Sequence, residues 1–124
     1  MQHSQLCRSS AWHRLTAAAA RAGVDAGERE KLVGAVLREL AVRVTPARWR
    51  ELCDWLPSDV RSLAGARHAD RVAPREQLVA AVGADTGLPR PVTVVAVRTV
   101  LAELCRIVPA RTVPARLATD VPGL

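Results

Sequence analysis

Two histidines and a cysteine near the start of the chain are residue types that bind metal ions. His3 and Cys7 are four residues apart, and His13 follows ten residues after His3. A spacing of four places two side chains on one face of a helix, as a pair of zinc ligands requires. A closed zinc site takes four ligands, and no third and fourth ligand is spaced to complete it. We therefore expect no metal site.

Cysteine and serine are the residues that could act as nucleophiles. Cys53 and Cys105 fall on expected inward-facing positions, where a cysteine behaves as a small apolar residue. A catalytic cysteine needs a nearby histidine, and His68 is the only one beyond the N-terminal segment. No serine stands in a Gly-x-Ser-x-Gly elbow, and no phosphate loop or Gly-x-Gly-x-x-Gly pattern occurs. The sequence therefore predicts no catalytic residues and no cofactor.

Two groups of arginines are candidate contacts for an anion. They are Arg67, Arg71 and Arg75 in the middle of the chain, and Arg106 and Arg111 near its end. A helical stretch with arginines four residues apart would present a basic stripe to phosphates. Gly65 and Pro74 favour a loop for most of the first group. The pattern leaves nucleic-acid binding as an alternative function.

Tryptophan is the only aromatic residue type in the chain, and it occurs at positions 12, 49 and 55. Trp49 and Trp55 are six residues apart, so they do not share one face of a straight helix. Trp49 falls in register with Leu52, which predicts that it faces inward. Trp55 lies off that stripe and is either an exposed contact for a partner or packed beneath the segment that follows.

The composition is that of a compact globular protein with a basic surface. The chain has 124 residues, 49% of them hydrophobic, and a formal charge of +6. The charge either reflects a general preference for arginine or marks a face that meets an anionic partner. Three widely spaced cysteines do not make a disulfide framework. With neither a signal peptide nor a membrane-spanning stretch, we expect a reduced, cytoplasmic protein without membrane contact.

Apolar residues at helical spacing predict a chain of helices separated by proline and glycine. Ser9 or Ser10 caps the first helix, Gly23 ends it, and Ser58 is expected to cap the short helix at 58–65. Asp25 and Glu28 resemble a capping box before the long second helix. The expected helices cover about 10–22, 25–44, 46–56, 58–65, 74–87, 91–108 and 113–118.

An internal duplication organises these helices. Residues 35–40 read Ala-Val-Leu-Arg-Glu-Leu, and residues 99–104 read Thr-Val-Leu-Ala-Glu-Leu, an offset of 64. The β-branched run at 92–97 looks like a strand by itself, but its counterpart is helical, so we predict a helix there. Glu39 and Glu103 occupy equivalent positions, and we expect both on exposed helix surface.

The predicted fold is therefore all-α, a single compact bundle of two pseudo-repeats with three to four helices each. A flexible N-terminus at 1–9 precedes one helical domain at 10–124. That domain comprises repeat one at about 10–64, a bridge at 65–73 and repeat two at about 74–121.

The repeated unit resembles the bacterial family known as domain of unknown function 2267. The likeness runs from about Trp12 to Val121 and is strongest in two motifs: Val36-Leu37-x-x-Leu40, and Leu-Pro-Ser-Asp-Val-Arg at 56–61. In the second copy the Leu-Pro pair becomes Leu117-Ala118. The resemblance implies an all-helical bundle with no assigned activity, and it supplies no catalytic residues.

A duplicated apolar framework without catalytic residues favours a non-enzymatic module that works by protein–protein contact, with a homodimer as one form of that contact. Trp55 is the candidate partner contact. A nucleic-acid-associated protein with an arginine-rich face is the alternative. An enzyme or ligand-binding protein with an unrecognised pocket is the second alternative.

Overall fold

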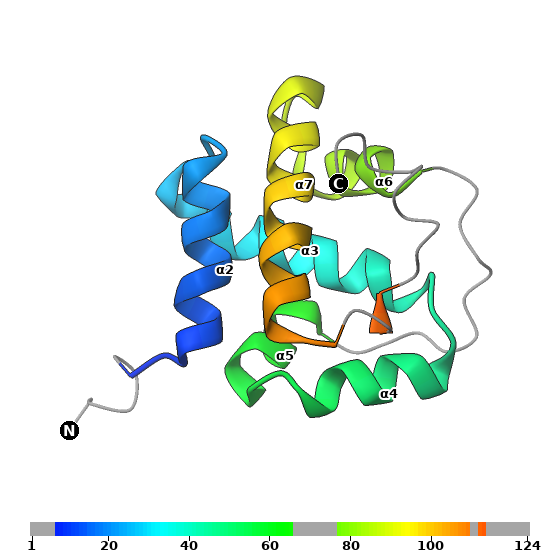
Figure 1. The fold of residues 1–124 in the computed structure, drawn as a ribbon. Helices are drawn as coiled ribbons and strands as arrows, with labels where there is room; N and C mark the ends of the chain where they lie inside the picture. The colour runs from blue at the N-terminus through cyan, green and yellow to red at the C-terminus, as the bar shows by residue number, and fades with distance from the viewer. Residues whose placement is uncertain (1–6, 66–76, 110–111, 114–124) are drawn as a thin grey trace.

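The computed structural model describes residues 7–65, 77–109 and 112–113, and every element in those ranges is helical (Figure 1). In chain order these are α2 (Ser10–Arg21), the short 3-10 helix η1 (Ala26–Glu28), α3 (Arg29–Ala41), α4 (Pro46–Asp54), α5 (Ser58–Ala64), α6 (Leu78–Thr86) and α7 (Arg90–Ile107). The prediction of a compact all-α fold is confirmed. The expected helix at 113–118 lies almost wholly outside the described residues.

Helix α3 is the centre of the bundle. It packs against α2, α5, α6 and α7, so nearly all its residues from Leu32 to Ala41 are buried. Helices α2 and α7 lie side by side on one flank, and α4 runs along the lower edge (Figure 1). Because the chain has no Phe or Tyr, leucine, valine and alanine fill this core. The largest fully buried side chains are mostly leucines: Leu15, Leu32, Leu37, Leu40, Leu52, Leu78, Leu101 and Leu104.

Several helix ends follow their sequence signals. The Ser9 hydroxyl accepts a hydrogen bond from the Trp12 N–H and caps α2, as predicted. Thr45 caps α4 in the same way, with Pro46 as the first helical residue. Gly87 ends α6 at a φ of +75°, a left-handed conformation that glycine adopts without a Cβ clash.

Two predicted caps are wrong. Asp25 makes no side-chain capping bond, and the long second helix opens instead with the 3-10 turn η1. Ser58 is the first residue of α5 rather than its cap, because Pro57 takes the extended capping conformation. In both cases the chain path into the helix, set by packing, overrides the local preference of the polar side chain.

The β-branched run at 92–97 forms the first half of α7, as the duplication predicted. Its threonines are accommodated by internal hydrogen bonds: the Thr93 hydroxyl donates to the Pro89 carbonyl at 2.9 Å, and the Thr99 hydroxyl donates to Val95 at 2.7 Å. Burial of Ala96, Val97 and the following apolar residues offsets the low helix propensity of this stretch.

The placement of Glu39 and Glu103 on exposed surface is wrong, because both glutamates are buried. Glu39 lies on the central helix α3, which has neighbours on several sides. Glu103 faces the flank of α7 that α2 covers. The sequence pattern shows one apolar stripe per helix, and it cannot show how many sides of a helix other helices cover.

Asp59, near the start of α5, connects that helix to the start of α2. The Ser9 N–H donates to Asp59 Oδ2 at 2.7 Å, and the Ser9 hydroxyl donates to Oδ1 at 2.8 Å. Ser9 is thus both the predicted cap of α2 and a partner of α5. Burial acts to raise the pKa of Asp59, but the bonds from Ser9 and the Val60 N–H outweigh it, so the pKa lies below its ordinary value.

The contact between Ser9 and Asp59 leads us to expect that the fold becomes less stable in acid. The folded-state pKa of Asp59 is lowered, so its carboxylate contributes to the free energy of unfolding at pH values above the ordinary pKa of 3.8. This contribution is lost as the pH falls through the folded-state pKa. We expect the wild type to melt at a higher temperature than Asp59→Asn at pH 7, and the gap in Tm to narrow towards pH 2. Thermal melts monitored by circular dichroism across this pH range check it. A gap that stays constant would contradict the role of the carboxylate charge.

Candidate functional site

Glu103 is a buried carboxylate shared by three arginines. The Arg14 Nε–H donates to Glu103 Oε2 at 2.6 Å. On the other carboxylate oxygen, Arg106 Nη1 donates to Oε1 at 3.4 Å, and Arg21 Nη2 lies 3.7 Å from Oε1. Only 8% of the Glu103 side chain is exposed, against 43%, 57% and 71% for Arg14, Arg21 and Arg106. The carboxylate therefore lies behind guanidinium groups that solvent can reach.

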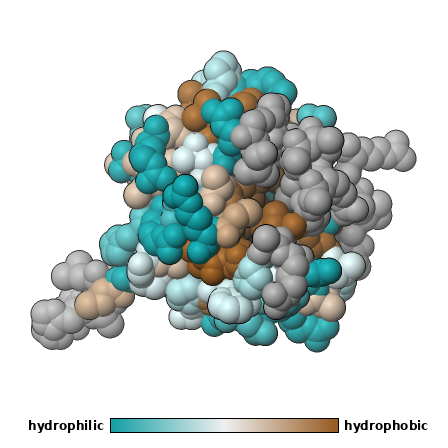
Figure 2. Space-filling view, in the orientation of Figure 1, coloured by the Kyte–Doolittle hydropathy of each residue, from teal (hydrophilic) through white to brown (hydrophobic). Residues whose placement is uncertain are grey.

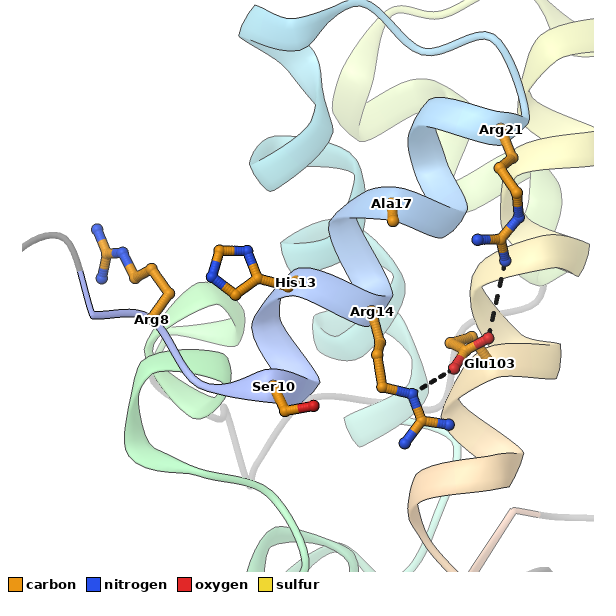
Figure 3. A pocket seen from close by; sticks show the side chains of 7 residues that line it. All are labelled: Arg8, Ser10, His13, Arg14, Ala17, Arg21 and Glu103. Atoms are coloured by element: carbon orange, nitrogen blue, oxygen red, sulfur yellow. Dashed lines mark hydrogen bonds and ion pairs between the residues drawn. The ribbon is translucent and has the colours of Figure 1, made fainter.

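Helices α2 and α7 place these side chains together from opposite ends of the chain. Ser10, Arg14, Ala17 and Arg21 recur every three or four residues, which aligns them along one side of α2. Arg106 lies one turn after Glu103 on α7. Figure 3 shows Arg14 and Arg21 reaching from α2 towards Glu103 across the boundary between the helices.

A surface pocket of about 510 Å³ lies along this boundary. It is lined by Arg8, Ser10, His13, Arg14, Ala17, Arg21 and Glu103. Hydrophilic side chains gather over this side of the molecule (Figure 2). The volume falls in the range of small-molecule sites, and the lining is polar and cationic, unlike the mostly apolar lining that such sites usually have.

The two ends of the pocket differ. Arg14 and Arg21 lie at the end next to Glu103, whereas Arg8 and His13 lie at the other end (Figure 3). The Arg8 guanidinium carbon lies 4.2 Å from the centre of the Trp12 ring, a cation–π contact that holds this arginine near the start of α2. The end next to Glu103 therefore holds the denser cluster of charge.

The three guanidinium groups and the one carboxylate of this cluster carry a net charge of +2; Arg14, Arg21 and Glu103 line the pocket, and Arg106 meets Glu103 from outside that lining. One carboxylate has two oxygens, so it cannot satisfy all the donors of three arginines. The Nη groups of Arg14 have no hydrogen-bond partner among the described residues, since its bond to Glu103 uses Nε. The arrangement can therefore bind an oxyanion, with Glu103 holding the arginines in position.

Glu39, which has the position of Glu103 in the similar sequence at 35–40, has a different partner. Glu39 pairs with Arg43 in its own helix: Arg43 Nη1 donates to Glu39 Oε1 at 3.0 Å and to the Glu39 carbonyl at 2.8 Å. The side chains are only 3% and 7% exposed. This pair is part of the interior, whereas the arginines at Glu103 face solvent.

The candidate residues named from sequence are only partly placed by the structure. Arg106 belongs to the cluster at Glu103, while Arg67, Arg71, Arg75 and Arg111 lie outside the described residues. Trp55, at the end of α4, is 52% exposed and is the one large apolar side chain exposed in the described ranges. It therefore lies open to solvent, while Trp49 is half-buried against the core.

Arg14 and Arg21 were not among the candidate contact residues predicted from the sequence. Their spacing of seven residues on a helix with a clear apolar side was an available signal, because it places both on one polar stripe. Their convergence on Glu103, 89 positions after Arg14, was not available. That contact depends on the packing of α2 against α7.

Among the described residues, the other reactive side chains do not come together in a second site. Cys53 and Cys105 are half-buried, and desolvation by burial raises the pKa of each thiol, which disfavours the reactive thiolate. Within residues 7–65, 77–109 and 112–113 no three metal-binding side chains come together. No helix in these ranges combines the length and apolar composition needed to cross a membrane.

Comparison with protein-family models, curated proteins and solved structures found no match for this chain. The α2–α7 pocket and the exposed Trp55 are the two surface features that point to a function.

Proposed function

We propose that this protein is a non-enzymatic helical module that binds an acidic segment of another protein through the pocket between α2 and α7. The observation that carries the proposal is the cluster of Arg14, Arg21 and Arg106 around the buried Glu103. A buried carboxylate that fixes solvent-facing arginines gives a preorganised cationic surface, and this reduces the entropy lost on binding.

The proposal includes the two-repeat organisation. It is supported by packing, since α2 lies against α7 while α6 lies against α3, so the first helix of each copy covers the long helix of the other. Gly23 and Gly87 follow the first helix of each copy, and both have positive φ. We also propose that the repeated unit is related to the family known as domain of unknown function 2267, on the basis of the motifs at 36–40 and 56–61.

The duplication also supports placing function on the α2–α7 face. Under the offset of 64, Arg14 corresponds to Leu78 and Arg21 corresponds to Asp85. Asp85 forms an ion pair with Arg38 at 3.8 Å, so the position on α6 that corresponds to Arg21 carries the opposite charge. The arginines of α2 that meet Glu103 therefore have no basic counterpart at these two positions of α6.

A nucleic acid is the second candidate partner, because the same arginines could contact phosphates. The four other arginines named for that role lie outside the described residues, and none of the three tryptophans is among the residues that line the α2–α7 pocket. A homodimer with Trp55 at its contact is a further form of protein–protein interaction that the exposed ring supports.

Fluorescence anisotropy with labelled peptides tests the proposal. The probes are a Glu- and Asp-rich peptide, its Gln and Asn counterpart, and a short DNA duplex, each at low and at physiological salt. We expect the acidic peptide to bind, and Arg14→Gln/Arg21→Gln to weaken it by about tenfold or more through loss of charge-assisted hydrogen bonds. Arg50→Gln, an exposed arginine on α4, is the matched control and is expected to bind normally.

The variant Trp55→Ala tests whether the acidic peptide binds at the α2–α7 pocket or at the end of α4. Unchanged acidic-peptide binding in this variant supports the pocket. Loss of binding in Trp55→Ala, with normal binding in the double arginine variant, would move the site to the end of α4 and overturn the proposal. Tighter binding of duplex than peptide, with a steep fall in affinity at higher salt, would favour the nucleic-acid alternative.

A further inference from the structure

We infer that the group recognised at the end of the pocket next to Glu103 is a phosphate monoester rather than a carboxylate. This inference rests on the proposed function and specifies its ligand chemistry. Three features of the α2–α7 pocket carry it: the unused donors of Arg14, the charge around Glu103, and the space above Ala17.

The first feature is the pair of Arg14 Nη groups, which are hydrogen-bond donors without a partner among the described residues. Glu103 binds Arg14 through Nε at 2.6 Å, which fixes the plane of the guanidinium and leaves the Nη1 and Nη2 groups as a fork. Such a fork matches two oxygens of one phosphate, and arginine binds phosphate bidentately for this reason. Arg21 is only 3.7 Å from Glu103 Oε1, a loose ion pair, so it can turn towards a third oxygen.

The charge is the second feature. Arg14 and Arg21 line the pocket and Arg106 offsets the charge of Glu103 from outside the lining, so the cluster carries +2, whereas a carboxylate carries a single negative charge. A phosphate monoester carries about −1.5 to −2 near neutral pH, so it matches this excess more closely. Repulsion from Glu103 is limited, because its carboxylate is buried behind the arginines and already shared among them.

The space is the third feature. Ala17 is exposed and stands between Arg14 and Arg21 on the same side of α2, and it lines the pocket. Its methyl group leaves a hollow between two long cationic side chains, which a tetrahedral phosphate can enter. A larger side chain at position 17 would fill the hollow without changing any charge, and this separates a shaped site from general attraction to a basic surface.

Isothermal titration calorimetry at constant ionic strength and pH 7.5 tests the inference. The ligands are inorganic phosphate, O-phosphoserine, a phosphoserine peptide, and the same peptide with Ser or Glu at that position. We expect the phosphoserine peptide to bind about tenfold or more tightly than its Glu version, because of the extra charge and the third oxygen.

Two variants test shape and geometry. Ala17→Leu and Arg14→Lys each preserve the net charge, and each is expected to lower phosphopeptide affinity by about tenfold, since arginine and lysine differ at bidentate sites. Ala47→Leu and Arg50→Lys are matched changes at exposed positions of α4 and should leave affinity unchanged. Circular dichroism melts of all four variants separate lost binding from lost folding.

The results of these titrations distinguish failure of the phosphate inference from failure of the proposed function. If the Glu peptide binds as tightly as the phosphopeptide, the phosphate inference is overturned while the proposed function stands. If Ala17→Leu binds phosphopeptide normally and remains folded, the shaped site is overturned. If no peptide binds, both proposals fail. If O-phosphoserine alone binds as tightly as the peptide, the phosphate chemistry is supported, its source is a small molecule, and the proposed protein partner is contradicted.

Discussion

Replacing Gly34 by alanine is expected to destabilise the fold by about 2 kcal/mol or more, because overpacking of a rigid interior costs in this range. A Cβ at Gly34, in the middle of α3, would lie against the Leu63 carbonyl oxygen well inside van der Waals contact, and 3.1 Å from its carbonyl carbon. That oxygen belongs to the backbone of α5, so it cannot move without shifting the helix. Helix propensity favours alanine by only about 1 kcal/mol, which does not offset the clash.

Chemical denaturation of wild type and Gly34→Ala measures this effect. Gly83→Ala is the matched control, since it is also a glycine within a helix, but its added Cβ would meet only Thr93 side-chain atoms at 3.8 Å. The control is expected to be neutral or to stabilise by up to about 1 kcal/mol. Equal effects of the two substitutions would show that α3 and α5 do not approach each other as closely as described.

Glu39→Ala is expected to cost about 3–5 kcal/mol of unfolding free energy, the range for removing one member of a buried ion pair. Arg43 is 7% exposed and donates to Glu39 Oε1 at 3.0 Å. Removal of the carboxylate takes an oppositely charged partner from a guanidinium group that stays buried. Urea unfolding followed by circular dichroism gives the free-energy difference.

Two comparisons isolate the charge effect. The double variant Glu39→Leu/Arg43→Leu removes both charges and is expected to cost less than Glu39→Ala alone. Glu103→Ala is also expected to cost less, because its three arginines are 43–71% exposed and can be hydrated when released. A double variant as unstable as Glu39→Ala would indicate lost packing rather than an uncompensated charge.

The sequence predicted the helices well where local signals act alone. Thr45-Pro46 and Gly87 mark helix ends through their own backbone preferences, and the structure places α4 and α6 accordingly. The strand-like run at 92–97 is helical, as the similarity of 35–40 to 99–104 led us to predict, because that match places 92–97 opposite a segment at 28–33 that was expected to be helical. The helix-end signals depend on residues within one or two helical turns, whereas the prediction at 92–97 came from comparing segments 64 residues apart.

The sequence could not predict which glutamates are buried or which arginines meet. Glu39 and Glu103 stand in similar local sequences, yet Glu39 pairs with Arg43 of its own helix. Glu103 pairs with Arg106 of its own helix and also with Arg14 and Arg21 of α2. The difference arises because α2 contributes Arg14 and Arg21 at one boundary, and no short-range pattern connects residues 89 positions apart. The close approach of Gly34 to Leu63 is likewise invisible in the chain itself.

By itself, then, the sequence determined the all-helical class, most helix boundaries and the apolar residues of the core, since these follow from backbone preference and apolar periodicity. Tertiary structure alone decided that α3 is enclosed, that Trp55 is exposed and that three arginines surround Glu103. The physical reason is that burial and ion pairing depend on which helix faces meet, and that choice is made by packing over the whole chain.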